Sequence, residues 1–187
     1  MTRKVKQRRT AMSTNSLIFQ EQQDGTLKGI YCHWDGYLQY NGVILSESYS
    51  DPKKLAKLLE LGDLSSLGEE LEASEAVRLY GFSYYVSEAF KALSDEEQER
   101  LRNEDRSGKY TVAYHRDRGE ELKPLKTITL EEQKNGENRF SNCYEFIYVQ
   151  DKNGVWYVNS IFGNKMINGR SFTKLEEELK ELEKQEA

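Results

Sequence analysis

Two short turns, each flanked by apolar segments, constrain the fold of this chain more than any other sequence feature. The first is Asp24-Gly25, and the second is the run Asp-Lys-Asn-Gly at residues 151–154. Asparagine or aspartate followed by glycine favours a tight turn between two antiparallel strands. The flanking segments, which we predict to be strands, are Ser16–Gln20, Leu27–Trp34, Asn142–Val149 and Val155–Ser160. The sequence therefore predicts two β-hairpins, with one further strand over residues 109–116.

Two helices are predicted between the hairpins. Asp51 followed by proline is typical of a helix start, and Gly62 occupies the position of a C-terminal capping glycine. Ser94 is followed three residues later by a glutamate, which predicts a second helix over Ser94–Asn103. Residues 69–93 mix helix formers with a Tyr-Gly-Phe break, and their pattern indicates neither helix nor strand clearly.

The acidic C-terminal segment predicts a terminal helix over residues 171–187. Ser171 or Thr173 would cap this helix. Its apolar stripe would comprise Phe172, Leu175, Leu179 and Leu182. Hairpins separated by helices differ from the alternating strand–helix order of a parallel sheet. We therefore predict an α+β fold, in which several short helices pack on a mainly antiparallel sheet built from hairpins.

One domain, over residues 12–170, is predicted between two charged ends. The 12 tyrosines, 7 phenylalanines and 2 tryptophans supply large apolar surfaces that a disordered chain lacks. Residues 1–11 are predicted to form a flexible basic arm, which carries Arg3, Lys4, Lys6, Arg8 and Arg9. Such an arm could contact nucleic acid by neutralising phosphates. Alternatively it is an unfolded leader, or translation begins at Met12.

The sequence excludes several classes of protein. No apolar run approaches the roughly 18 residues that cross a bilayer. The basic N-terminus leads into polar residues instead of the apolar core of a secretory signal, so the expected location is the cytoplasm. Cys32 and Cys143 lack the spacing of a metal site, and we expect both thiols to be reduced. No glycine-rich phosphate or dinucleotide motif occurs, so neither a cofactor nor a metal is predicted.

The first of the two histidines lies in the run Tyr-Cys-His-Trp-Asp-Gly-Tyr at residues 31–37. At the end of a strand, alternate residues share a face, so Tyr31, His33 and Asp35 would lie together. An aspartate beside a histidine orients the ring and raises its basicity. His33 could then act as a general acid or base near neutral pH.

The second histidine lies in the run Tyr-His-Arg-Asp-Arg-Gly-Glu-Glu at residues 114–121, where His115 and Asp117 would share a strand face. If the two clusters meet, their histidines could serve as acid and base in metal-independent cleavage of a phosphodiester. Arg116 or Arg118 would bind the phosphate. The structural alternative is that each cluster is an ordinary strand end, in which the carboxylates organise turns and salt bridges.

Three blocks in the same order resemble a family of small uncharacterised proteins from phages, prophages and other mobile elements of Gram-positive bacteria. The blocks are residues 31–37, the run Leu-Gly-Asp-Leu-Ser-Ser-Leu-Gly at residues 61–68, and residues 114–121. A Tyr- and Trp-containing hairpin over Tyr144–Tyr157 is also similar. The resemblance covers roughly residues 12 to 160. It implies a mobile-element setting, without catalytic residues to carry over, and type II anti-CRISPR proteins share that setting and chain size.

Two classes of function follow from these observations, and enzyme status is left open. The first is an accessory protein that antagonises a host defence system by binding its RNA-guided nuclease or the guide RNA. The aromatic residues considered for its interface are Trp34, Tyr37, Tyr84, Tyr85, Trp156 and Tyr157, although most of them are expected in the core. The alternative is a ribonuclease that uses His33 and His115. A structural or interaction role in the phage is the remaining alternative.

Overall fold

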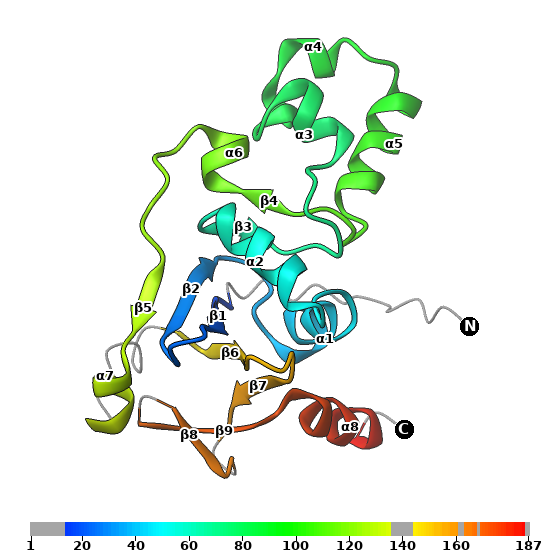
Figure 1. Cartoon of the computed structure of the whole chain (residues 1–187). Helices are drawn as coiled ribbons and strands as arrows, with labels where there is room; N and C mark the ends of the chain where they lie inside the picture. The colour runs from blue at the N-terminus through cyan, green and yellow to red at the C-terminus, as the bar shows by residue number, and fades with distance from the viewer. Residues whose placement is uncertain (1–13, 136–143, 161–162, 168, 186–187) are drawn as a thin grey trace.

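A computed structural model describes residues 14–135, 144–160, 163–167 and 169–185 of the chain. The predicted basic arm lies outside the described residues. So do Asn142 and Cys143, the first two residues of a predicted strand. The described residues form a mixed sheet with helices on it and a separate group of helices at one end (Figure 1). No helix in these ranges is long and apolar enough to cross a membrane.

The first predicted hairpin is confirmed. Strands β1 (Ser16–Glu21) and β2 (Leu27–Cys32) pair antiparallel, with Ser16 opposite Cys32. The Asp24 carboxylate accepts hydrogen bonds from the Thr26 amide and hydroxyl at 2.9 and 2.7 Å. Gly25 has a φ of +80°, which glycine adopts without strain. The second strand ends at Cys32, two residues earlier than predicted.

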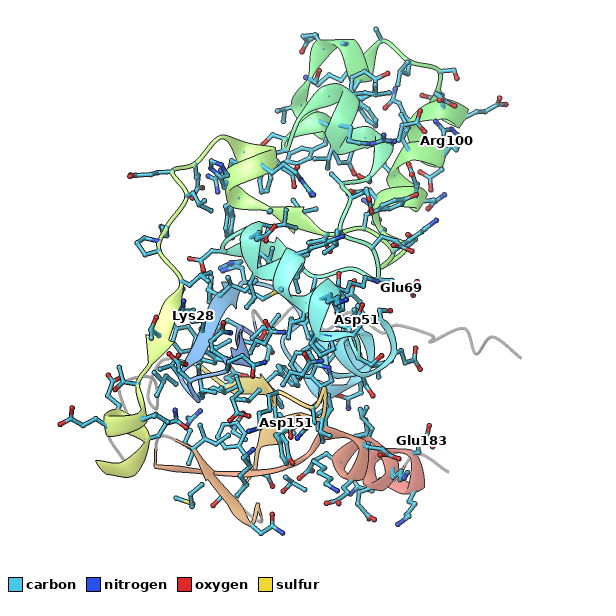
Figure 2. The ribbon with its side chains drawn as sticks, viewed as in Figure 1. Lys28, Asp51, Glu69, Arg100, Asp151 and Glu183 are labelled. Carbon is cyan, nitrogen blue, oxygen red and sulfur yellow. The ribbon has the colours of Figure 1, made fainter. Side chains whose placement is uncertain are left out.

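The second predicted hairpin is also present, with β6 (Phe146–Gln150) and β7 (Trp156–Asn159) antiparallel. The Asp151 carboxylate fixes the turn because it accepts hydrogen bonds from the amides of Asn153 and Val155, both at 2.9 Å. Figure 2 labels Asp151 at this turn. Strand β6 lies parallel to β1, so the two hairpins join into one sheet through strands that are far apart in the sequence.

Five further strands complete the described sheet, and only the β1–β6 and β2–β3 pairs are parallel within it. These strands are β3 (Leu64–Ser66), β4 (Val112–Ala113), β5 (Lys126–Ile128), β8 (Lys165–Ile167) and β9 (Arg170–Lys174). The strand order is β4-β3-β2-β1-β6-β7-β9-β8, and β5 also pairs with β2. The predicted α+β class with a mainly antiparallel sheet is confirmed.

Alternating residues of the central strands build a core on each face of the sheet. On one face, Ile18 and Ile30 pack with helices α1 (Val43–Ser48), α2 (Pro52–Glu60) and α8 (Leu175–Gln185). Leu17 and Phe19 belong to the opposite face, where they pack with apolar residues of β5, β6, β8 and β9. Helix α2 starts and ends as predicted, since Asp51 accepts a hydrogen bond from the Lys53 amide and Gly62 has a φ of +75°.

Residues 69–111 form a separate group of helices, which we call the helical cap (Figure 1). It contains α3 (Glu75–Tyr80), the 3-10 helix η2 (Tyr84–Val86), α4 (Glu88–Lys91) and α5 (Asp95–Asp105). Its own core comprises Ala73, Ala76, Val77, Tyr84, Phe90 and Leu101. Ser94 caps α5 as predicted, since its hydroxyl accepts a hydrogen bond from the Glu97 amide at 3.3 Å.

A narrow neck joins the cap to the sheet. Two backbone segments, residues 68–72 and 108–111, run side by side there. The amides of Glu69 and Glu70 donate to the carbonyls of Gly108 and Lys109, at 3.2 and 2.7 Å. Figure 2 labels Glu69 at this neck and Arg100 further out, on α5. The Arg100 guanidinium bridges α5 to α3 because it pairs with Glu75 at 3.0 Å.

Two predicted elements are wrong. The predicted strand over residues 109–116 shrinks to β4, and residues Tyr114–Arg118 form the short helix α6 instead. The predicted terminal helix begins only at Leu175, because residues 170–174 form strand β9 between β7 and β8. Phe172 is therefore a buried residue of the sheet and not part of a helical stripe. The alternation of Ser171, Phe172 and Thr173 also fits a strand, and its partner strands decide the outcome.

Candidate functional site

The block at residues 31–37 forms a tightly constrained loop after β2. The His33 and Trp34 amides donate to the carbonyls of Leu64 and Ser65, both at 3.0 Å, so the loop continues alongside β3. Asp35 then adopts a left-handed backbone, with a φ of +57°. At Gly36 a Cβ would lie 2.6 Å from the backbone of residue 15, so only glycine fits this position.

The side chain of a buried asparagine, Asn41, is hydrogen-bonded to this loop. The loop leads into η1 (Leu38–Gly42), a π-helical turn of a kind that is rare and often found at functional sites. This turn buries Asn41, whose side-chain amide donates to the Ser16 hydroxyl at 3.1 Å and to the Trp34 carbonyl at 3.5 Å. The Tyr148 hydroxyl donates to the Gly36 carbonyl at 2.8 Å. The backbone around Trp34 is therefore fixed by the core, while the indole is 43% exposed.

The Tyr31 hydroxyl and His33 Nδ1 are 2.7 Å apart and share a hydrogen bond, which confirms that these residues share a face. The His33 ring also stands edge-on to Trp34, with centroids 4.5 Å apart. The predicted contact between His33 and Asp35 is wrong. The Asp35 carboxylate instead accepts a hydrogen bond from the Tyr37 hydroxyl at 3.3 Å. The left-handed backbone at Asp35 ends the two-residue alternation on which the prediction depended.

Burial raises the pKa of Tyr31 to about 12, with a smaller contribution from the nearby Tyr114 phenol. The phenol therefore remains neutral across the physiological range and can both donate and accept a hydrogen bond there. Its neighbour His33 is oriented by a neutral group, and not by a carboxylate as the sequence predicted.

The second cluster serves mainly to attach α6 to the neck. The Asp117 carboxylate accepts a hydrogen bond from the Ala113 amide at 2.7 Å and pairs with Arg116. The Arg116 guanidinium also donates to the carbonyls of Leu71 and Thr111, at 2.6 and 2.7 Å. Arg116 is thus occupied by four acceptor atoms, which argues against its predicted role in phosphate binding.

His115 does not contact Asp117 as predicted, because the two residues lie on a helix and not on a strand. Its Nδ1 instead shares a hydrogen bond with the Glu120 carbonyl at 2.7 Å. Arg118 is exposed and pairs with the Glu120 carboxylate at 3.3 Å. Its guanidinium also lies 5.2 Å from the centroid of the Phe82 ring, so Arg118 contacts the helical cap.

Asp63 links the two clusters, and sequence reasoning assigned it no role. Its Oδ1 atom accepts hydrogen bonds from the Tyr31 amide and the Lys126 ammonium, both at 2.8 Å. Its carbonyl accepts a hydrogen bond from the Tyr114 amide at 3.1 Å. Asp63 borders a small hollow beside His115 and an open groove of about 450 Å³. The residues that line the groove are Asn15, Tyr31, Asp63, Lys123, Lys126 and Tyr144.

Each of the three sequence blocks contributes one residue to this junction: Tyr31, Asp63 and Tyr114. Asp63 is therefore hydrogen-bonded to both histidine-containing blocks. A signal for Asp63 was present in the sequence, since it stands directly after the capping glycine of α2 and inside the second block.

The aromatic residues considered for an interface separate into two groups. Trp156 and Tyr84 are buried, as the core alternative predicted, and the Trp156 indole donates to the Tyr49 carbonyl at 3.0 Å. Tyr37 and Tyr157 are half-buried. Trp34 and Tyr85 remain as the exposed members, and they lie in the loop after β2 and on the cap respectively.

Comparison with protein-family models, curated protein sequences and solved structures gives no match. In the residues that the structure describes, no three His, Cys, Asp or Glu side chains converge to hold a metal ion. Function is therefore inferred from the geometry of this site.

Proposed function

We propose that this protein is a mobile-element accessory factor that antagonises a host defence system by binding its RNA-guided nuclease or the guide RNA. The observation that carries the proposal is the presentation of Trp34. This large apolar side chain is 43% exposed, although Asn41 and β3 hold the backbone around it. A tryptophan that is already ordered loses little entropy on binding, so it can contribute strongly to affinity.

The surroundings of Trp34 support a binding surface. His33 stands edge-on to the indole, and Tyr31 is hydrogen-bonded to His33, so an aromatic row follows the end of β2. Tyrosine and tryptophan offer apolar area together with a polar atom, a combination that is enriched at interfaces. The mobile-element setting is supported by the resemblance of the three blocks, which lie side by side at Asp63.

The test is inhibition of a purified type II nuclease loaded with its guide RNA. The protein should form a complex with the loaded nuclease on size-exclusion chromatography and reduce cleavage of target DNA. Trp34→Ala should weaken this complex by at least ~10-fold, as expected for a central interface residue. The matched control is Met166→Ala, which truncates a side chain that is 63% exposed on β8. Full cleavage at saturating protein, with no complex, would reject the proposal.

A second candidate, a metal-independent ribonuclease, is favoured by the two histidine rings. His33 and His115 are each hydrogen-bonded through Nδ1, to the Tyr31 hydroxyl and to the Glu120 carbonyl. Such bonds orient a ring so that Nε2 is directed outward for proton transfer. Asp35 and Asp117 have no part in this version, because neither carboxylate holds a histidine.

Incubation of the protein with guide RNA in EDTA, followed by a denaturing gel, separates the two candidates. Discrete shortening of the RNA that is lost in both His33→Ala and His115→Ala would establish the ribonuclease. RNA that stays intact while the nuclease is inhibited would leave binding as the activity.

A further inference from the structure

The helical cap exposes three large apolar side chains within eight consecutive residues. Leu79 is 62% exposed at the end of α3, and Tyr85 and Val86 are 59% and 58% exposed on η2. The turn between α3 and η2 is tight, since the Tyr84 amide donates to the Gly81 carbonyl at 3.0 Å. Single exposed apolar residues are common on protein surfaces, whereas a group of them is typical of a contact surface.

The core of the cap does not include these three side chains. Its core is already closed by their immediate neighbours: the rings of Tyr80 and Tyr84 stand edge-on to Phe90, with centroids 5.6 and 5.0 Å apart. The Tyr84 hydroxyl is also paired, since it donates to the Asp105 carboxylate at 3.0 Å. Leu79, Tyr85 and Val86 are not part of this core, although the Tyr85 ring also stands edge-on to Tyr84. Their exposed apolar surface therefore needs another explanation.

Charge identifies the kind of partner. Residues 69–111 contain six lysines and arginines and eleven aspartates and glutamates, a net charge of −5. The whole chain also has a net charge of −5, so the remaining residues sum to zero. Within the described ranges, Asp95, Glu96 and Glu99 are exposed on α5 and form no ion pair, whereas Glu75 and Glu97 are both paired with Arg100.

We infer that the helical cap is a second interaction surface, which docks on a protein partner whose contact face is an apolar hollow bordered by lysines and arginines. The apolar side chains at residues 79–86 would enter the hollow, and the acidic residues of α5 would meet the basic border. Nucleic acid and the anionic surface of a membrane would repel the cap. A second copy of the chain is disfavoured, because a two-fold contact would bring two caps of charge −5 together.

This inference rests on the proposed function only for the partner used in its test, the purified type II nuclease without guide RNA. Binding to the immobilised nuclease is measured by surface plasmon resonance. One variant replaces the apolar pair, Tyr85→Ser with Val86→Ser, and another reverses charge, Glu96→Lys with Glu99→Lys. Each should raise the Kd by at least ~10-fold, and the charge effect should shrink between 0.1 and 0.5 M salt because screening increases.

Matched controls are available on the sheet and its helices. Met166→Ser replaces an equally exposed apolar side chain, and Glu47→Lys with Glu60→Lys reverses two exposed charges on α1 and α2. Both controls should bind like the wild type. Circular dichroism and a thermal melt of every variant show whether the fold is retained.

The outcomes separate this inference from the proposed function. If both cap variants bind normally and Trp34→Ala loses binding, the cap inference is overturned and the proposed function stands. If the wild type forms no complex with the nuclease, alone or with guide RNA, both are overturned. Dimerisation of the wild type in sedimentation that the Tyr85 and Val86 substitutions abolish would also overturn the inference, since the partner would be a second copy. Loss of binding in the cap variants but not in their controls supports it.

Discussion

The sheet and the helical cap each bury an apolar core of their own, and the two cores differ in size. The sheet buries a core on each face, with large side chains such as Phe19 and Tyr148 fully enclosed. The cap encloses only six buried apolar residues and leaves Tyr85 among several large apolar side chains on its surface. The sheet and the rest of the chain sum to zero charge, whereas the cap carries −5. The difference is the basis of our proposal that the cap contacts another molecule.

The two regions meet through the neck and through Phe82 of the cap, whose ring lies near Arg118 and Tyr114 of α6. Backbone hydrogen bonds pair the two segments of the neck, and Arg116 adds a side chain that reaches the Leu71 carbonyl. The Tyr49 hydroxyl donates from the sheet side to the Gly68 carbonyl at 2.8 Å. A connection of this size allows the cap to open independently of the sheet, as cooperative units within a domain often do.

Removing one large buried side chain from each core should have the largest effect on the free energy of unfolding. It also tests directly whether the cap opens independently of the sheet. Phe90→Ala and Phe19→Ala each remove a fully buried ring, and each should cost about 3–5 kcal/mol of the free energy of unfolding. Native-state hydrogen exchange should show lost protection in Phe90→Ala over residues 73–105 alone. In Phe19→Ala the protection should fall throughout the sheet.

The same pair of variants could remove the distinction between the regions. If Phe90→Ala reduces protection equally in β1 and in α5, the cap and the sheet unfold as one unit. The neck would then be stronger than its few hydrogen bonds indicate.

Gly68→Ala should act at the junction with an intermediate effect. A Cβ at Gly68 would lie 2.3 Å from the carbonyl carbon of Tyr110, so the two neck segments would have to separate. Overpacking of this kind costs about 1–3 kcal/mol, which urea unfolding would measure. The control is Gly42→Ala, where the nearest atom would be 3.4 Å away and stability should change little. Equal stability of the two variants would contradict the packing of the neck.

Signals confined to a few neighbouring residues predicted much of this fold. Both hairpins follow from turns in which aspartate binds the backbone two residues ahead, and α2 follows from the cap at Asp51 and the glycine at 62. Strand β5 was missed because its partner β2 lies about 100 residues earlier in the sequence. Strands β8 and β9 form a further hairpin at the edge of the sheet, and β9 was missed because its residues were assigned to the terminal helix. Helix α6 was missed for a related reason, since Arg116 holds it by reaching back 45 residues to Leu71.

The site was predictable in its members but not in their contacts. The sequence predicted that Tyr31 and His33 share a face, and they are hydrogen-bonded. The contact between the His33 and Trp34 rings was not predicted, because strand alternation would place neighbouring residues on opposite faces. Pairing each histidine with an aspartate two residues later assumed a regular strand, which a left-handed residue interrupts at Asp35 and a helix replaces at His115. No local pattern could place Asp63 between the clusters, because its partners come from three different strands or helices.

Asn41→Ala should have a more local effect, confined to the loop that presents Trp34. The substitution removes hydrogen bonds to the Ser16 hydroxyl and the Trp34 carbonyl, at a cost of about 1–3 kcal/mol. The indole N–H signal of Trp34 should broaden in the NMR spectrum, whereas that of Trp156, buried beside Tyr49, should not change. A sharp and unshifted Trp34 signal would show that β3 alone fixes the loop. Lys91→Ala, an exposed change on the cap, should leave both signals unchanged.

The smallest effect is expected at alkaline pH, where both regions should lose stability through a buried tyrosine. Burial raises the pKa of Tyr49 on the sheet side and of Tyr84 in the cap to about 12, and Asp105 contributes at Tyr84. An unfolded tyrosine has a pKa near 10, so the unfolded state ionises first as the pH rises. The stabilisation is complete below pH 10 and is lost between about pH 10 and 12. Urea unfolding at pH 9 and 11 should therefore show a loss in the free energy of unfolding that is smaller in Tyr49→Phe and in Tyr84→Phe than in the wild type.

The control for this prediction is Tyr85→Phe, beside Tyr84 but exposed, which should follow the wild type. If Tyr84→Phe reduces the alkaline loss in the cap but not in the sheet, as followed by backbone amide signals of α5 and of β1, the regions titrate independently. An equal reduction in both would mean that they share one unfolding transition.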